Sequence, residues 1–163
     1  MKKRMIFVLF ALVFLLCSCE MPISMAELLE YQNNDFSCDA ILDGKTKTEL
    51  HIKSNGGKII ISIADTEYMN NVSFVFSADN AEIICDEIKI PMENTDLQRL
   101  FTVYKMMTLD HTEIWHITRE KNGGIEVYKC ICDGYTAYID AKTHLPLRFE
   151  HGEEALDIIR MDF

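Results

Sequence analysis

Histidines and acidic residues are the side chains of this sequence best suited to acid–base or metal chemistry, but their spacing does not bring them together. His111 and His116 are five positions apart in an expected strand, so their side chains point to opposite faces. Asp86 and Glu87 are adjacent in an expected strand and point apart in the same way, whereas Asp140 fits the cap of a turn. Because the sequence also lacks a phosphate loop and a nucleophile elbow, we predict a protein that binds and does not catalyse.

Cysteines are the other reactive side chains, and the sequence has six of them. Cys130 and Cys132 are two positions apart in a strand-like run, so they share a face and are poorly placed to bond to each other. With Cys38 and Cys85 they make four cysteines, which allow three pairings. Three alternatives remain. The cysteines are small apolar residues of the core, reduced or paired without a structural role, or two of them form a cross-strand disulfide. The third alternative is a metal site, but the sequence has no second Cys/His pair at zinc spacing. We predict no metal and no diffusible cofactor.

The N-terminus has the pattern of an export signal followed by an attachment site. Three basic residues, Lys2, Lys3 and Arg4, precede an apolar run over residues 5–16 that is too short to cross a bilayer as a helix, which needs about 20 residues. Leu16-Cys17-Ser18-Cys19 resembles the lipobox of bacterial lipoproteins, whose cysteine receives a diacylglyceryl group before the signal is cut. The resemblance implies a cleaved signal over residues 1–18, a covalent lipid (diacylglyceryl or acyl) on Cys19 and a lipidated tether over residues 19–23. It implies an exported protein held on the extracytoplasmic face of the cell membrane.

The net charge excludes one class of partner. The sequence has 16 Lys+Arg and 26 Asp+Glu, a net charge of −10. Residues 1–18 contain three of the basic residues and none of the acidic ones, so the remainder has 13 against 26, or −13. A nucleic-acid surface needs clustered Lys and Arg to replace counterions, so we expect no nucleic-acid partner.

The remaining residues, 24–163, are expected to form a single β-rich domain that begins with a short helix. Ser24 to about Gln32 is predicted to be helical, with Ser24 and Glu27 in the capping-box pattern. The apolar period then changes to two, and Asn55-Gly56 is the strongest hairpin signal.

The middle of the chain is expected to contain one long strand and a second helix. Ala81–Ile90 is predicted to be a strand that Pro91 ends. Leu97–Met107 has the apolar spacing of an amphipathic helix, with Asn94 or Thr95 as its cap.

The C-terminal part is expected to add strands over Glu113–Arg119, Ile125–Cys132 and Gly134–Asp140, then two more alternating runs. Nine or ten strands at short, regular spacing, with helices at the start and in the middle, favour an antiparallel sheet over a parallel βαβ sheet.

The segment Tyr138-Ile139-Asp140-Ala141-Lys142-Thr143-His144-Leu145-Pro146-Leu147-Arg148, together with this element order, resembles the lipoprotein-localisation family of LolA, LolB and the mycobacterial LppX-type lipoproteins. Asp140 can hydrogen-bond the turn backbone, and Pro146 fixes φ for the entering strand. The resemblance implies an α+β, mainly β fold, in which a strongly curved antiparallel sheet, a half-barrel, wraps around one or two helices and leaves an apolar cavity.

Two functions follow as expectations. The first is binding of an apolar ligand, a lipid or a lipoprotein acyl chain, between sheet and helix. The second is a closed, acidic interaction module that docks on another envelope protein and regulates or positions it. The candidate lining of the cavity, which is also the candidate core, consists of Phe74, Phe76, Leu97, Phe101, Tyr104 and Phe149.

Overall fold

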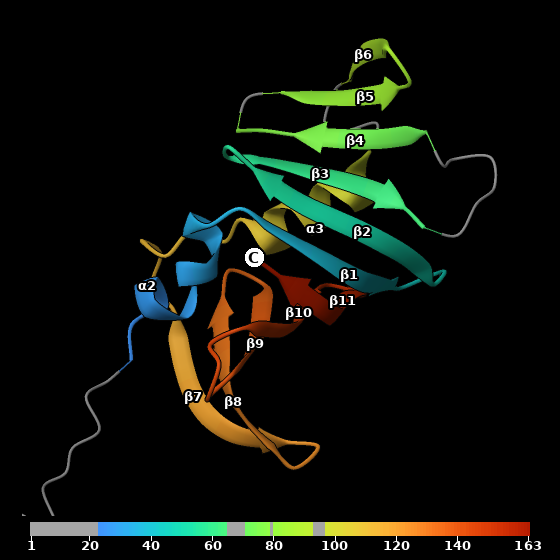
Figure 1. Cartoon of the computed structure of the whole chain (residues 1–163). Coiled ribbons are helices and arrows are strands. Elements are labelled where there is room, and N and C mark those ends of the chain that lie inside the picture. Colours follow the sequence, from blue (N-terminus) through green and yellow to red (C-terminus); the bar gives the residue numbers. More distant parts are fainter. Residues whose placement is uncertain (1–22, 65–70, 79, 93–96) are drawn as a thin grey trace, which may run out of the picture.

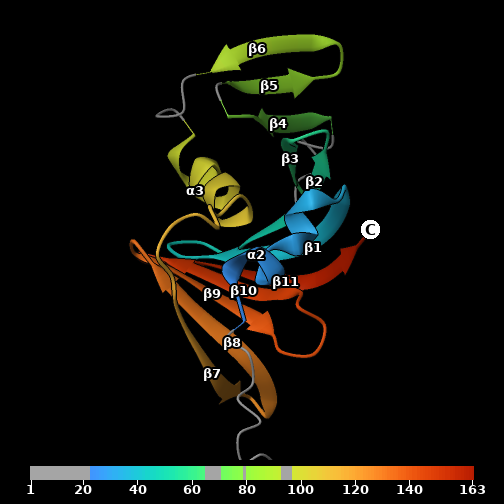
Figure 2. The ribbon, with the colours of Figure 1, turned by 90° about the vertical axis from the view of Figure 1, so that its left-hand side faces the viewer.

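The computed structural model describes residues 23–64, 71–78, 80–92 and 97–163. Within these residues an eleven-stranded sheet has the order β6-β5-β4-β3-β2-β1-β11-β10-β9-β8-β7, and all neighbouring strands are antiparallel. The sheet is strongly curved, with α3 inside the curve and α2 beside its open end (Figure 1 and Figure 2). This confirms the expected fold, an α+β, mainly β domain with a curved antiparallel sheet around one or two helices.

The helical elements of the described residues are two α-helices and one 3-10 helix. They are α2 (Met25–Leu28), η1 (Glu30–Asn33) and α3 (Gln98–Met107). The strands are β1 (Phe36–Asp43), β2 (Thr48–Asn55), β3 (Lys58–Ile63), β4 (Val72–Phe76), β5 (Ala81–Cys85), β6 (Ile88–Met92), β7 (His116–Asn122), β8 (Ile125–Cys132), β9 (Tyr135–Asp140), β10 (Pro146–His151) and β11 (Glu154–Asp162).

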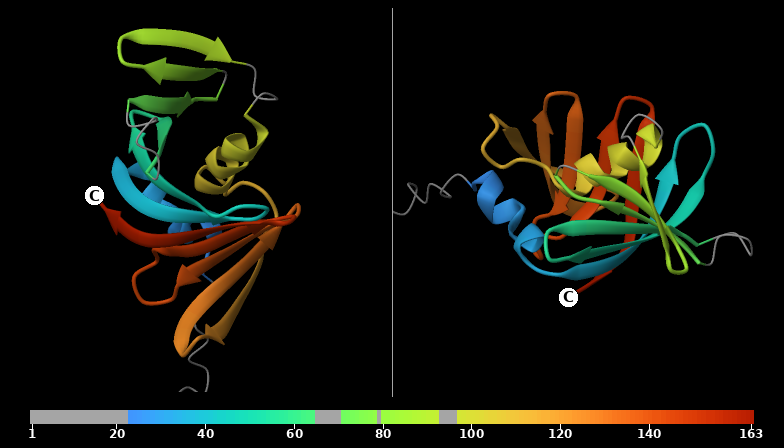
Figure 3. Two further views of the ribbon diagram at one scale, coloured as in Figure 1. Left: turned by 90° about the vertical axis from the view of Figure 1, so that its right-hand side faces the viewer. Right: turned by 90° about the horizontal axis from the view of Figure 1, so that it is seen from above.

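The sheet consists of two meanders that meet in the middle. β1 to β6 are neighbours in chain order, and so are β7 to β11. The pairing of β1 with β11 joins the two meanders, and Figure 3 shows them curving to either side of this seam. Because all the remaining pairings join strands that are consecutive in the chain, short turns specify most of the strand register.

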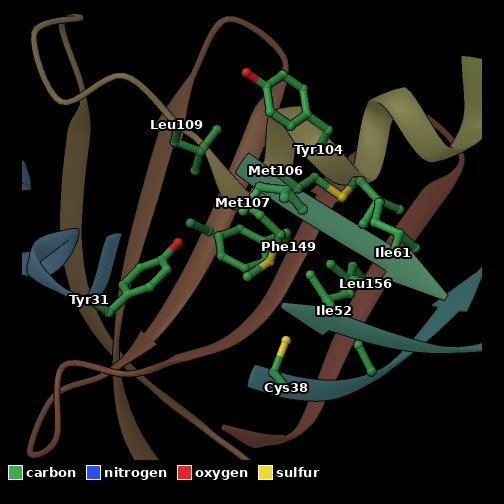
Figure 4. Close-up of a cluster of buried hydrophobic side chains, with 14 of the residues drawn as sticks. Tyr31, Cys38, Ile52, Ile61, Tyr104, Met106, Met107, Leu109, Phe149 and Leu156 are labelled. Atoms are coloured by element: carbon green, nitrogen blue, oxygen red, sulfur yellow. The ribbon is translucent and has the colours of Figure 1, made fainter. Parts of the chain in front are cut away.

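The core lies on the concave face. β1 alternates strictly between buried and half-buried residues, and its inward side chains are Phe36, Cys38, Ala40 and Leu42. Buried residues of α2, η1 and α3 complete the same cluster, part of which is drawn in Figure 4. The period-two pattern of the sequence therefore marks the face that the helices cover.

The predicted first helix is confirmed at its start and shorter than expected. Ser24 Oγ accepts a hydrogen bond from the Glu27 backbone N–H at 3.3 Å, and a Glu27 carboxylate oxygen accepts one from the Ser24 N–H at 3.1 Å. α2 ends at Leu28, and the chain continues as η1. The burial of Tyr31 next to Phe36, with ring centroids 5.8 Å apart, accompanies this tighter turn.

The prediction of a single strand over Ala81–Ile90 is wrong. The chain turns at Asp86 and Glu87, where Asp86 has a φ of 54°, and β6 returns to pair with β5. Asp86 and Glu87 are thus turn residues, not strand residues on opposite faces. Pro91 lies within β6, where a missing N–H is tolerated because β6 is at the edge of the sheet.

Two further boundaries differ from the expectation or cannot be compared. The strand predicted from Glu113 begins at His116, because Asp110 first holds a turn by accepting the Thr112 N–H at 2.7 Å. The predicted cap residues of α3, Asn94 and Thr95, lie outside the described residues. Leu97 occupies the N-cap position and makes no capping hydrogen bond through its side chain.

None of the helices in the described residues is both long and apolar enough to span a membrane.

Candidate binding site between α3 and the sheet

α3 is the helix that divides the concave face into a filled part and an open part. Its buried side chains are Val103, Tyr104, Met106 and Met107, and it packs mainly against β10, β3 and β4. The predicted helix over Leu97–Met107 therefore exists and lies against the sheet, as the apolar spacing required.

Arg99 fixes the N-terminal turn of α3 to the start of β11 and to the loop before β2. Its Nε donates to Glu154 Oε1 at 2.7 Å, and its Nη1 and Nη2 donate to the side chain and the carbonyl of Thr46 at 2.8 and 2.6 Å. Glu154 starts β11 and Thr46 precedes β2. Because the helix has no side-chain cap, these bonds hold its first turn in place.

Four of the six predicted lining residues are buried in the core. Phe76 and Phe149 are 1% exposed, Phe74 is 5% and Tyr104 is 8% exposed. Phe149 lies on β10, in the middle of the buried cluster, on the sheet side of α3 (Figure 4). These side chains fill the space directly under the helix.

The other two predicted residues, Leu97 and Phe101, are only half-buried and pack against this cluster. Phe101 and Tyr104 stack at 5.7 Å between ring centroids, and both rings lie against Phe76 of β4, at 6.3 and 5.7 Å. The structure thus brings three of the six together as one aromatic group at the β4 side of α3.

Beyond this aromatic group the concave face continues as an apolar surface on β4, β5 and β6. The strand register places its side chains in three rows that run from β4 through β5 to β6. We call them the β4–β6 apolar surface: Val72, Cys85 and Ile88; Phe74, Ile83 and Ile90; Phe76, Ala81 and Met92.

Exposure rises along these rows with distance from α3. Phe76 and Phe74 on β4 are buried, Ile83 on β5 is half-buried, and on β6 Ile90 is 46% and Ile88 is 64% exposed. Figure 2 shows β5 and β6 extending past α3. An apolar surface that is continuous with the core and open at one end is suited to an apolar ligand.

The convex face of the sheet is polar where β10, β11, β1 and β2 meet. Arg148 bridges Glu150 and Asp157 at 2.8 and 2.6 Å, and Asp39 accepts from His51 at 2.8 Å and from Arg160 at 3.0 Å. The hydrogen bond from His51 lowers the pKa of the Asp39 carboxyl. These side chains satisfy one another and remain in contact with water, so this face does not suit an apolar ligand.

A polar depression of about 380 Å³ lies at the start of α3, on the side away from the β4–β6 apolar surface. Its walls include both members of the Arg99–Glu154 pair and His151, whose ring stacks on Tyr135 at 4.1 Å between centroids. Glu154 Oε2 is buried there without a hydrogen-bond partner. The charged walls make this depression unsuitable for an acyl chain.

The four cysteines of the described residues are free thiols, which leaves the disulfide alternative without support. Burial raises the pKa of Cys38 and of Cys130 to about 12. Cys132 donates to a Glu113 carboxylate oxygen at 3.1 Å, and this bond raises its pKa to about 11. Protonated thiols of this kind are poor nucleophiles and poor metal ligands.

The described residues contain no cluster of histidine, cysteine, aspartate and glutamate that could hold a metal ion. His111 and His116 are both exposed, one in a turn and one at the start of β7. Asp140 caps its turn as predicted, since its Oδ1 accepts the N–H groups of Lys142 and Thr143 at 2.8 and 2.7 Å.

The sequence did not indicate the residue that anchors α3 or one half of the apolar surface. Arg99 is an ordinary helix residue in the sequence, and its partners Thr46 and Glu154 are 53 and 55 positions away. The β5–β6 half of the apolar surface was missed because Ala81–Ile90 was interpreted as one strand. The acidic pair Asp86-Glu87, between two apolar alternating runs, was the signal for a turn.

No protein family and no curated protein matches this sequence. Among solved structures, the chain is similar to an uncharacterized conserved protein from Thermus thermophilus, with a TM-score of 0.55, 8% identity and coverage of 83% of each chain. It is also matched to a LolA superfamily protein from Nitrosomonas europaea with a TM-score of 0.42, at 8% identity over 86% of this chain and 94% of that chain. The first similarity shows a shared fold, and it carries no information about a ligand.

Proposed function

We propose that this protein is an exported lipoprotein, held on the extracytoplasmic face of the cell membrane by a lipid on Cys19, that binds an apolar ligand. The ligand is a lipid or a lipoprotein acyl chain, and it lies along the β4–β6 apolar surface beside Phe101. The observation that carries this proposal is the rise in exposure along the middle apolar row, from 5% at Phe74 on β4 to 46% at Ile90 on β6. Covering such surface contributes about 25 cal/mol per Å² of apolar area.

The sequence supports the same function independently. The lipobox pattern Leu16-Cys17-Ser18-Cys19 accounts for membrane attachment, and the segment over residues 138–148 resembles the lipoprotein-localisation family. The buried members of the predicted lining, Phe74, Phe76, Tyr104 and Phe149, then form the floor and support of the site. Leu97 and Phe101 form its border with α3.

The position of Cys85 offers a direct test. It lies in the first apolar row, between Val72 and Ile88, and is half-buried, whereas Cys132 lies far along the sheet on β8. Residues 20–163 contain the whole core cluster, so this part can be used without the lipid. We expect a long-chain acyl ligand to slow maleimide labelling of Cys85, with the rate at Cys132 unchanged, measured by peptide mass spectrometry. Equal protection of both thiols, or of neither, contradicts the proposed site.

A substitution at the open end of the surface tests the same site. Ile90→Glu places a charge where the ligand lies, and because Ile90 is 46% exposed the fold tolerates it. Ile125→Glu is the matched control, since Ile125 is 51% exposed on the side of β8 opposite to the buried Cys130. We expect Ile90→Glu to weaken acyl-chain binding about tenfold or more, as for a charge buried in an apolar site, and Ile125→Glu to leave it unchanged.

The alternative function is a closed, acidic module that docks on another envelope protein. Native mass spectrometry of the protein purified from its own cells separates the two. Lipid that copurifies and is lost in Ile90→Glu supports the binding function. Protein that is free of lipid and takes up no added acyl ligand favours the docking module.

A further inference from the structure

Lys105 is placed to recognise the head of the ligand. It is exposed on α3, and its Nζ lies 5.4 Å from the centre of the Phe101 ring and 5.9 Å from that of Tyr104. Both rings pack against Phe76, where the β4–β6 apolar surface begins. A positive charge therefore lies at the border between this surface and solvent.

Lys105 differs from the arginines of the described residues, because each of those arginines already pairs with a carboxylate. Arg99, Arg119, Arg148 and Arg160 each pair with a carboxylate at 2.6 to 3.2 Å. The Lys105 ammonium faces aromatic rings instead, and its hydrogens have no carboxylate partner among the described residues. Other lysines of the described residues, Lys53 among them, also have no carboxylate partner, but Lys105 lies beside the β4–β6 apolar surface, so its charge is available to the anionic group of a ligand that binds there.

We propose that the ligand is an anionic amphiphile, whose chain lies on the β4–β6 apolar surface and whose oxyanion pairs with Lys105. The inference deepens the proposed function and rests on it. The charge of the ligand complements Lys105, and its chain covers the exposed apolar side chains of β6. The head is the carboxylate of a free fatty acid or the phosphate of a lipid headgroup, because an ammonium pairs with either oxyanion.

The test compares three amphiphiles with the same twelve-carbon chain, each below its micelle concentration, on residues 20–163. They are dodecanoate, dodecyl phosphate and the neutral monododecanoylglycerol, and binding is measured by calorimetry. We expect at least one anion to bind about two- to fivefold more tightly than the neutral ligand, a gain typical of an exposed charge pair, and to lose that gain at high salt. The tighter of the two anions identifies the head as carboxylate or phosphate.

Lys105→Gln should reduce the affinity for the preferred anion to that for the neutral ligand, and Lys105→Arg should restore it. Lys53→Gln, an exposed lysine of β2 that points away from the buried Ile52, removes the same charge elsewhere and should have no effect. Equal binding of all three amphiphiles, or unchanged binding in Lys105→Gln, overturns the assignment of Lys105 while the apolar site stands. Failure of all three to bind overturns both proposals.

Discussion

At the scale of single residues, the four thiols have different surroundings, and these predict an order of reactivity. Cys38 and Cys130 are 2% and 0% exposed with pKa values raised to about 12, and Cys132 is hydrogen-bonded to Glu113 with a pKa of about 11. Cys85 is half-buried and lies at the end of β5, next to a turn. At pH 8 without ligand, we expect maleimide to label Cys85 first, Cys132 more slowly, and the two buried thiols only when urea unfolds the protein. Rapid labelling of Cys130 in the native state would contradict the packing of β7, β8 and β9.

Asp140 makes a second prediction at this scale. Its carboxylate accepts two backbone N–H groups, and the bond from Thr143 is the largest cause of its lowered pKa. Asp140→Ala removes the acceptor and should lower the free energy of unfolding by about 1 kcal/mol, as for other lost side-chain caps. Asp140→Asn keeps one oxygen acceptor and should cost less.

The pH dependence of this effect has a definite sign. Because the pKa of Asp140 is lower in the folded protein, the unfolded chain binds the proton more readily. The contribution of Asp140 is therefore complete above the unfolded pKa of about 3.9 and is lost as the pH falls through the folded pKa. Urea unfolding of wild type and Asp140→Asn should differ in stability at pH 6 and converge toward pH 3. A constant difference across this range would show that the carboxylate charge does not matter.

The roles of single residues could be predicted from the sequence where their hydrogen-bond partners are close along the chain. The capping box of Ser24 and Glu27 and the turn cap of Asp140 each span three positions, so both were evident from the sequence. Arg99 depends on Thr46 and Glu154, which the fold brings from other elements, and no local pattern marks it. Lys105 contacts two rings of its own helix, but the β4 residue on which those rings pack is distant in the sequence.

At the scale of elements, the attachment of α3 depends on the Arg99–Glu154 pair. Both side chains are partly buried, at 31% and 24% exposure, and Glu154 Oε2 already lacks a partner. Arg99→Ala leaves the whole carboxylate unpaired and frees the first turn of the helix, so we expect a loss of about 2 kcal/mol in unfolding free energy. Denaturant unfolding measures it.

A double variant separates the two causes of that loss. If the unpaired Glu154 charge dominates, Glu154→Gln in the Arg99→Ala background should recover part of the stability, although Glu154→Gln alone destabilises the protein. Strict additivity of the two single changes would mean that the pair contributes no coupling. The loss would then come from the bonds between Arg99 and Thr46.

Element prediction failed where irregular backbone interrupts a regular pattern. The turn at Asp86 and Glu87 splits one apparent strand into two, because alternation continues on both sides of it. In the sequence, Ile159, Met161 and Phe163 stand at alternate positions, which would put them on one face of a regular strand. A bulge opposite Asp39 and Ala40 instead turns Ile158 and Met161 toward the core and leaves Ile159 63% exposed.

At the scale of the whole molecule, the sequence predicted the fold class but not the surface that α3 leaves open. Consecutive hairpins with period-two burial specify an antiparallel sheet, and the helix between them has to cover its apolar face. Which strands it covers depends on the curvature of the sheet and on the β1–β11 seam (Figure 1). The position of the β4–β6 apolar surface follows from that seam, because the seam places β10 and β3 together beneath α3 and leaves β5 and β6 beyond it.

The net charge and the proposed lipid attachment both concern the whole molecule. The residues after position 18 have 13 basic and 26 acidic side chains, so an anionic membrane surface repels the domain. The proposed attachment would then depend on the lipid on Cys19, since each buried methylene of an acyl chain contributes about 0.8 kcal/mol. In cells that express the full chain, Cys19→Ala should abolish incorporation of labelled fatty acid and the mass increase of the mature N-terminal peptide. Cys17→Ala, two positions away, should retain both, because a small residue still precedes Cys19. Labelled lipid on the Cys19→Ala protein would mean that another residue carries the lipid. A wild-type chain without label would contradict the proposed lipidation, and nothing else proposed for this acidic domain would then hold it at the membrane.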